Sequence, residues 1–182
     1  MKKLPTLFLD RDGVINRRTP GDYVKHPSEF VPETGAMQAL GMLSPHFSHI
    51  VVVTNQAGVG KGVMNETDLA AVHQKMRTLA GVAGGRIDGI YYCPHRPDAG
   101  CACRKPATGM AMQARSEFPE IDFSRAWMVG DSASDMVFGK TLGMKTILIN
   151  GKFEDTDALD ALSIDDRFDS LFDFARFFLA QI

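Results

Sequence analysis

Two carboxylates stand directly after the first apolar run of the sequence, and their spacing suits metal or acid–base chemistry. Asp10 and Asp12 are two positions apart at a predicted strand end, so both side chains should point to one side and Arg11 to the other. Such a pair can share a divalent cation, or divide the roles of nucleophile and general acid. An Asx-type turn is the alternative interpretation. A calcium loop of the EF-hand type is excluded, because Ile15 stands where that loop needs glycine.

A second group of reactive side chains gathers all three cysteines of the chain and one histidine within eleven residues. Their types are those of a closed tetrahedral zinc site, and they are Cys93, His95, Cys101 and Cys103. With every ligand supplied by protein, the metal is expected to be structural. Buried free thiols and a strained Cys101–Cys103 disulfide are the alternatives. Arg104 and Lys105 follow the last ligand, so a pinned loop would hold both cations in place.

A third polar segment, Gly130–Asp135, again follows an apolar run. Taken singly, it reads best as a helix start capped by Asp131 or Ser134. If it meets Asp10 and Asp12 at one edge of a sheet, a magnesium site becomes the better interpretation, because Mg²⁺ prefers carboxylate oxygens.

Other motifs carry less chemistry. The GVGKG stretch, Gly58–Gly62, is no P-loop, since Asn55 stands where the first glycine is needed and Gly62 replaces the Ser or Thr. We expect a flexible, cationic loop there. The remaining histidines have no metal or nucleophile spacing and are interpreted as surface or hydrogen-bonded core residues, at positions 26, 46, 49 and 73.

Short apolar runs alternate with helical patterns along the chain. The predicted strands are Leu4–Leu9, Ile50–Val53, Ile87–Tyr92, Ala126–Val129 and Lys145–Ile149. The predicted helices are Gly35–Leu43, Glu66–Leu79, Thr108–Phe118, Ser134–Leu142 and a terminal helix within 171–182. The acidic segment Glu154–Asp169 is expected to be a solvated loop or short helix. This alternation predicts an α/β fold, a Rossmann-like doubly wound parallel sheet, as a single domain over residues 1–182.

The reactive groups all follow predicted strands. Ligands of open α/β sheets bind beyond the carboxyl ends of the strands, so these loops are expected to converge at one edge. The polar run Thr54-Asn55-Gln56 follows the second predicted strand. The Cys/His segment follows the third predicted strand.

Composition limits the partners. A net charge of -2 and a pI near 6.2 argue against nucleic-acid binding and against membrane-surface binding, which usually need a basic surface. No apolar stretch approaches the length of a membrane span, and the N-terminal run LPTLFL is too short for a secretion signal. We therefore expect a soluble, cytoplasmic protein, and we take it to be a monomer.

Four segments, in order, resemble the four motifs of the haloacid dehalogenase (HAD) phosphatases: LFLDRDGVIN, VVVTNQAGVGKG, CRKPATGM and MVGDSASDM. Within that superfamily, the Cys-x-His…Cys-x-Cys insert is similar to the D-glycero-D-manno-heptose 1,7-bisphosphate phosphatases and to the histidinol-phosphate phosphatases. The resemblance implies a HAD fold with only small cap loops, Thr19–Pro32 and the zinc-binding loop.

The resemblance also implies catalytic roles. Asp10 would attack phosphorus, and Asp12 would protonate the leaving oxygen and then activate water. Thr54 would hydrogen-bond the phosphoryl oxygens, and Lys105 would neutralise them. Mg²⁺ would be held by Asp10, the backbone carbonyl of Asp12, and Asp131. Because Asp12 must donate a proton first, a raised pKa or a mild-acid limb in the rate profile is expected.

For the substrate, the resemblance implies recognition by Arg104, with Asn55 and Ser132 at the same pocket. Ser132 stands where both related groups usually carry a cation, and the possible replacements are Arg17, Arg18, Lys61 and Arg96. The favoured reaction is removal of the C7 phosphate of heptose 1,7-bisphosphate. The short insert of five residues between His95 and Cys101 instead favours histidinol phosphate. A non-catalytic, zinc-dependent binding module is the alternative from another class.

Overall fold

The structure, a computed structural model that describes residues 4–150 and 156–182, is built on one parallel sheet. In the described residues the sheet has six strands in the order β3-β2-β1-β4-β5-β6. The strands are β1 (Thr6–Leu9), β2 (His49–Asn55), β3 (Gly89–Cys93), β4 (Trp127–Gly130), β5 (Lys145–Ile149) and β6 (Asp166–Phe168). Every neighbouring pair is parallel, so all carboxyl ends lie at one edge.

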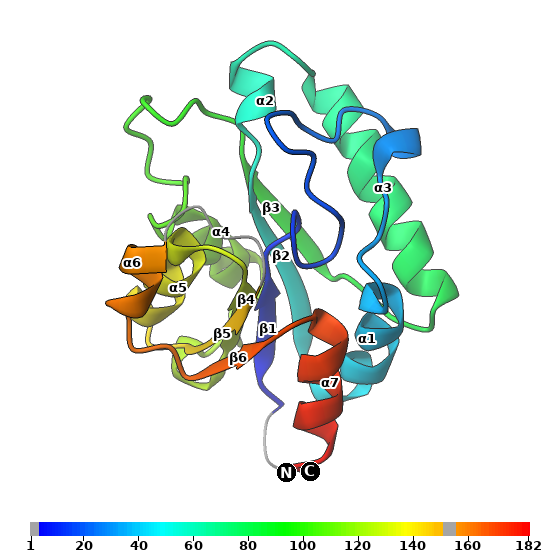
Figure 1. Ribbon diagram of the computed structural model, residues 1–182, viewed down its shortest axis with the longest axis vertical. Helices are drawn as coiled ribbons and strands as arrows, with labels where there is room; N and C mark the ends of the chain where they lie inside the picture. Colours follow the sequence, from blue (N-terminus) through cyan, green and yellow to red (C-terminus); the bar gives the residue numbers. More distant parts are fainter. Residues whose placement is uncertain (1–3, 151–155) are drawn as a thin grey trace.

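Helices cover both faces of this sheet. They are α1 (Ala36–Leu43), α2 (Ala57–Gly60), α3 (Glu66–Val82), α4 (Gly109–Glu117), α5 (Ala133–Thr141), α6 (Thr156–Asp160) and α7 (Leu171–Leu179). As Figure 1 shows, α1, α3 and α7 lie on one side of the sheet, and α4, α5 and α6 lie on the other. The predicted doubly wound α/β sheet is confirmed.

The alternation of side chains along β1 divides the core in two. Leu7 and Leu9 pack into the cluster beneath α1, α3 and α7, whereas Phe8 packs into the cluster beneath α4 and α5. All three are fully buried. Because β1 is central and covered on both faces, nearly every position along it is apolar.

Two elements were not predicted. β6 is a short edge strand whose residues are exposed or half-buried, so it lacks the apolar run that marks the inner strands. It belongs to the acidic segment expected to be a loop or short helix, which also contains α6; the part of that segment at Glu154 and Asp155 lies outside the described residues. The GVGKG stretch is not a flexible loop throughout, because its first residues form α2.

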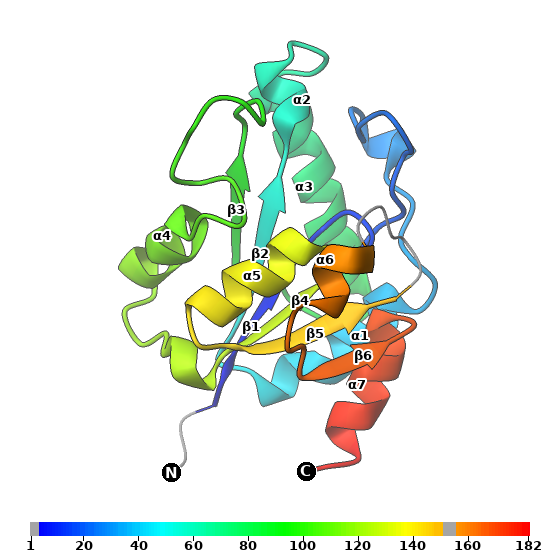
Figure 2. The ribbon, with the colours of Figure 1, turned by 60° about the vertical axis from the view of Figure 1, so that its left-hand side comes forward.

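The loops beyond the carboxyl ends of the strands build one end of the molecule. In Figures 1 and 2 the long loop between β3 and α4 leaves the sheet at the same end as α2. The segment between β1 and α1 contains no element larger than the 3-10 turn Pro27–Glu29, which agrees with the expectation of a small cap loop. Among the described residues, no helix has the length and apolar character needed to span a membrane.

Candidate active site

A cavity of about 870 Å³ opens at the carboxyl edge of the sheet. Loops after four strands line it, and it contains every residue predicted for catalysis or substrate binding: Asp10, Asp12, Thr54, Asn55, Arg104, Lys105 and Ser132. The predicted convergence of these loops is therefore correct. Asp131 is only 2% exposed and lies next to Asp10 in a buried acidic group.

Lys105 is the central cation of this site. Its ammonium lies 2.9 Å from Asp10 Oδ1 and 2.6 Å from Asp135 Oδ1, and it donates a hydrogen bond to the carbonyl oxygen of Val53 at 2.7 Å. Lys105, Asp10 and Asp135 are all buried. Because a buried charge is costly unless it is paired, this arrangement fixes the ammonium beside Asp10. From the sequence, Asp135 was named only as the end of the polar segment Gly130–Asp135, and its contact with Lys105 was not predicted.

The carboxyl groups of Asp10 and Asp131 resist ionisation. Burial and the charge of Asp135 raise the pKa of Asp10 to about 6, although Lys105 opposes the rise. Burial and the charges of Asp10 and Asp135 likewise raise the pKa of Asp131 to about 7, against the effect of Arg18. The raised pKa values show that the local positive charge does not fully compensate the carboxylates.

Asp12 has the opposite electrostatics. Its carboxylate accepts hydrogen bonds from Arg11 Nη2 at 3.0 Å, from Asn16 Nδ2 at 2.9 Å and from Gln56 Nε2 at 2.7 Å. Burial acts to raise the pKa of Asp12, but Arg11 and the other donors outweigh it, and the pKa is lowered. The expectation of a raised pKa is therefore wrong, because three donors stabilise the ionised form.

The predicted orientation of Arg11 is also wrong. β1 ends at Leu9, and the N–H groups of residues 14–16 all donate to the Arg11 carbonyl oxygen, so the strand alternation stops before Asp12. The guanidinium of Arg11 is fully buried and is shared between Asp12 and Nε2 of His73, which lies 3.1 Å away. Burial and the charge of Arg11 lower the pKa of His73 to about 3, so a neutral ring accepts this hydrogen bond.

Gln56 connects the first two loops and was not predicted as a site residue. Its side chain is fully buried, and Nε2 donates both to Thr54 Oγ1 at 2.9 Å and to Asp12 Oδ2 at 2.7 Å. Thr54 and Asp12 thus hold fixed positions on either side of one amide. Its place in the Thr54-Asn55-Gln56 run, directly after β2, was the available signal.

The acidic group has the composition of a divalent-cation site. One carboxylate oxygen from each of Asp10, Asp131 and Asp135 lies within 4.8 Å of the others. Asp131 Oδ2 is buried and has no hydrogen-bond partner among the described residues. Hard oxygen ligands and an unsatisfied buried carboxylate oxygen fit Mg²⁺. Gly13, at φ +94°, lets the backbone pass close by, since a Cβ there would lie 1.9 Å from Asp131 Oδ2.

The helix start after β4 differs from the prediction. Ser132, rather than Asp131 or Ser134, is the N-cap of α5. Its N–H and hydroxyl donate to Asp135 Oδ2 at 3.1 and 2.6 Å, and the N–H of Asp131 donates to the same oxygen at 3.1 Å. Asp135 therefore fixes this turn with one oxygen and contacts Lys105 with the other.

The four predicted zinc ligands come together. Cys93 Sγ lies 3.6 Å from His95 Nδ1 and 3.5 Å from Cys101 Sγ, and Cys103 Sγ lies 3.2 Å from His95 Nδ1 and 3.5 Å from Cys101 Sγ. A tetrahedral Zn²⁺ with bonds of about 2.3 Å would separate its ligand atoms by roughly 3.8 Å, so the arrangement fits. All three cysteines are free, and the Cys101–Cys103 disulfide is excluded.

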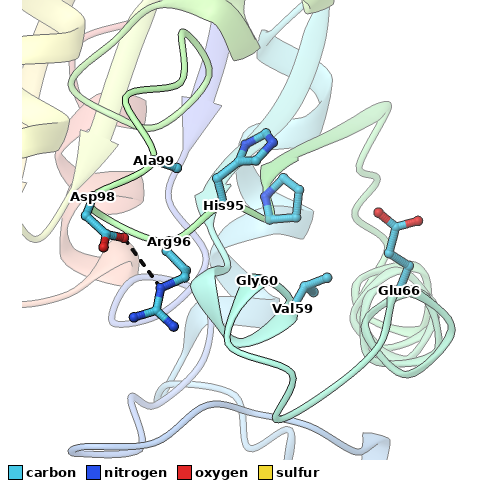
Figure 3. Close-up of a pocket in the computed structure, with 8 residues that line it drawn as sticks. Val59, Gly60, Glu66, His95, Arg96, Asp98 and Ala99 are labelled. Atoms are coloured by element: carbon cyan, nitrogen blue, oxygen red, sulfur yellow. Dashed lines mark hydrogen bonds and ion pairs between the residues drawn. The ribbon is translucent and has the colours of Figure 1, made fainter.

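This Cys/His loop packs against α2, and Figure 3 shows the pocket between them. The N–H of Gly60 donates to the carbonyl oxygen of Pro94 at 2.8 Å. A Cβ at Gly60 would lie 2.6 Å from that oxygen, so the close approach of the two backbones requires glycine. Arg96 and Asp98, which also line this pocket, form an exposed ion pair. Gly60 of the GVGKG stretch thus serves backbone packing.

Beyond the ligands, the loop delivers Arg104 to the cavity. Its Nη1 is buried and has no hydrogen-bond partner among the described residues. A buried guanidinium nitrogen that lacks an acceptor is suited to an anionic group of a ligand.

Comparisons with known proteins agree with this geometry. A family model described as HAD-hydrolase-like matches residues 102–173. The chain is 40% identical over 151 residues to a D-glycero-beta-D-manno-heptose-1,7-bisphosphate 7-phosphatase of Pseudomonas putida. The matched region covers 82% of this chain and 85% of the relative. It is 35% identical over 179 residues to the enzyme of that name from Neisseria meningitidis, and this match covers 96% of this chain and 95% of the relative. The crystal structure of D,D-heptose 1,7-bisphosphate phosphatase from B. bronchiseptica, complexed with magnesium and phosphate, matches with a TM-score of 0.90 and 32% identity, over 98% of this chain and 100% of that one.

Proposed function

Because the chain belongs to the HAD-like hydrolases, with the heptose-1,7-bisphosphate phosphatases as its relatives, we propose that it hydrolyses the C7 phosphate ester of D-glycero-D-manno-heptose 1,7-bisphosphate. The observation that carries this proposal is the buried Lys105 ammonium, held 2.9 Å from Asp10 Oδ1 in a cavity that also contains Arg104. A carboxylate beside a fixed cation suits attack on a phosphate whose oxygens need neutralising.

The reaction has two steps. An Asp10 carboxylate oxygen attacks phosphorus and the bond to the C7 oxygen breaks, while Asp12 gives that oxygen a proton. Water then attacks the aspartyl-phosphate, gives its proton to Asp12, and inorganic phosphate leaves Asp10 free. Splitting the hydrolysis in this way replaces one difficult step by two easier ones. The donors around Asp12 favour its ionised form, which is the form required to activate water; the protonated form that the first step uses is therefore the minor one.

The phosphoryl oxygens are bound by residues at the cavity floor. Lys105 supplies charge and Thr54, fixed by Gln56, supplies a hydroxyl. Asp10, the Asp12 carbonyl oxygen and Asp131 would hold Mg²⁺, which supplies positive charge that offsets the repulsion between carboxylates and phosphate. The close approach of carboxylate oxygens from Asp10, Asp131 and Asp135 and the unpartnered Asp131 Oδ2 support this assignment.

We assign Arg104, Asn55 and Ser132 to substrate binding, since all three line the cavity. The relatives favour heptose bisphosphate over histidinol phosphate, although the short insert alone pointed to the latter. The test compares kcat/KM for Mg²⁺-dependent phosphate release from the two compounds. A higher value for heptose 1,7-bisphosphate is expected, and a preference for histidinol phosphate would overturn the substrate assignment. No release from either would favour the non-catalytic module.

We further propose that Cys93, His95, Cys101 and Cys103 bind a structural Zn²⁺. Against the effect of burial, the backbone N–H of Arg104 and the neighbouring thiols lower the pKa of Cys101 to about 6, whereas burial raises the pKa of Cys93 and raises that of Cys103 to about 12, so zinc would displace protons from those two thiols. The metal would hold the loop that carries the substrate-binding cations.

Finally, we propose a single domain over residues 1–182 that acts as a cytoplasmic monomer. One sheet with helices on both faces supports the single domain. Free thiols support a reducing compartment.

A further inference from the structure

Arg18 reaches from the first loop to the buried acidic group. Its Nη2 donates to Asp131 Oδ1 at 2.7 Å, and its Nε donates to the backbone carbonyl oxygen of Asp12 at 3.3 Å. The Asp131 side chain is fully buried, whereas the Arg18 side chain is 38% exposed and lines the cavity. Arg18 is therefore the partner that can leave this ion pair.

Both oxygens that Arg18 contacts belong to groups assigned to the metal. The other carboxylate oxygen of Asp131, Oδ2, faces the turn at Gly13, where a Cβ would lie 1.9 Å away. A divalent cation held by Asp131 and the Asp12 carbonyl oxygen would compete with Arg18 for the same two groups. The Arg18 guanidinium and a divalent cation would also repel each other if both were bound to Asp131.

We propose that Arg18 and the divalent cation are alternative partners of Asp131 and the Asp12 carbonyl oxygen, and that Arg18, when displaced by the metal, binds the second phosphate of the substrate. Metal loading and substrate recognition would then be linked through one side chain.

The lining of the cavity supports a role for Arg18 in binding the second phosphate. At Ser132 the helix start offers a hydroxyl, already hydrogen-bonded to Asp135, and no cation. Arg18 lines the same cavity, and a guanidinium binds phosphate through paired N–H donors. The role of Arg18 in binding the second phosphate rests on the proposed function, since it needs a substrate with two phosphates. The competition between Arg18 and the metal does not depend on the proposed function.

The competition is tested without substrate. Mg²⁺ alone is titrated into the wild-type protein, Arg18→Met and Lys25→Met, with calorimetric detection. Lys25 is the control, because it is another ion-paired cation of the first loop that does not line the cavity. Arg18→Met should bind Mg²⁺ roughly three- to tenfold more tightly, since breaking a partly exposed ion pair no longer opposes binding. Unchanged or weaker binding, or an equal gain in Lys25→Met, would overturn the competition.

The substrate role is tested at saturating Mg²⁺. For Arg18→Met, KM for heptose 1,7-bisphosphate should rise about tenfold, while KM for heptose 7-phosphate stays near the wild-type value. Equal changes for both compounds would overturn this role. If the wild-type enzyme releases no phosphate from either, the proposed function fails, and the calorimetric result still decides the competition.

Discussion

The side chain of Asn55 and the backbone of Lys105 hydrogen-bond each other in both directions. The Lys105 N–H donates to Asn55 Oδ1 at 3.0 Å, and Asn55 Nδ2 donates to the Lys105 carbonyl oxygen at 3.2 Å. This pair attaches the loop after β3 to the end of β2. It fixes the backbone from which the Lys105 side chain reaches Asp10.

Replacing Asn55 by Ala should therefore weaken phosphate binding. Loss of both hydrogen bonds should lower the free energy of unfolding by about 1–3 kcal/mol and raise KM several-fold, because Lys105 is held less firmly. Denaturant unfolding and steady-state kinetics measure the two effects. Asn150→Ala, which follows β5 at the same sheet edge, is the control; equal effects of both variants would contradict the role of Asn55.

The Asp135 carboxylate should matter as much as the predicted ligands. Asp135→Asn removes a buried negative charge that contacts Lys105 and accepts from the turn after β4. We expect a loss of about 1.5–3 kcal/mol of stability and a marked fall in kcat, because the donors of Asp131 and Ser132 lose a charged acceptor, although Lys105 keeps Asp10 as its ion-pair partner. The exposed Asp98→Asn should behave as wild type. Wild-type melting and turnover in Asp135→Asn would refute this account.

The sequence predicted some of these contacts and not others, for physical reasons. Asp10 and Lys105 could be predicted to meet, because parallel strands bring their following loops to one edge. The orientation of Arg11 could not be predicted, because the alternation of side chains along a strand ends with β1 at Leu9 and the chain then enters a turn. Gln56 and Asp135 act through buried hydrogen bonds between loops, and such contacts follow from tertiary packing rather than from a spacing rule.

The neutral His73 should make stability depend on pH. Its pKa is lowered to about 3 in the folded protein from the ordinary value of 6.5, so below pH 6.5 the unfolded chain binds a proton that the folded protein does not. This group therefore favours unfolding increasingly as pH falls from about 6.5 toward 3. His73→Gln, which retains a neutral acceptor for Arg11, should flatten that part of the stability curve. A wild-type slope in His73→Gln would exclude this explanation.

The Cys/His loop should affect binding more than chemistry. Cys103→Ser should lose zinc, lower the melting temperature and raise KM, because the loop no longer holds Arg104 and Lys105 in place. Metal content by mass spectrometry, melting and kinetics test this together. A variant that has lost zinc and yet keeps normal KM and melting behaviour would show that the metal does not position the loop.

The most direct measurement of the central claim is phosphate release from heptose 1,7-bisphosphate by the wild-type enzyme and Asp10→Asn at saturating Mg²⁺. The wild type should release one phosphate and leave heptose 1-phosphate. Asp10→Asn should lose activity by roughly a thousandfold or more while it keeps a wild-type melting curve, because Lys105 retains Asp135 and the Val53 carbonyl oxygen as partners. Appreciable turnover by folded Asp10→Asn would contradict Asp10 as the nucleophile.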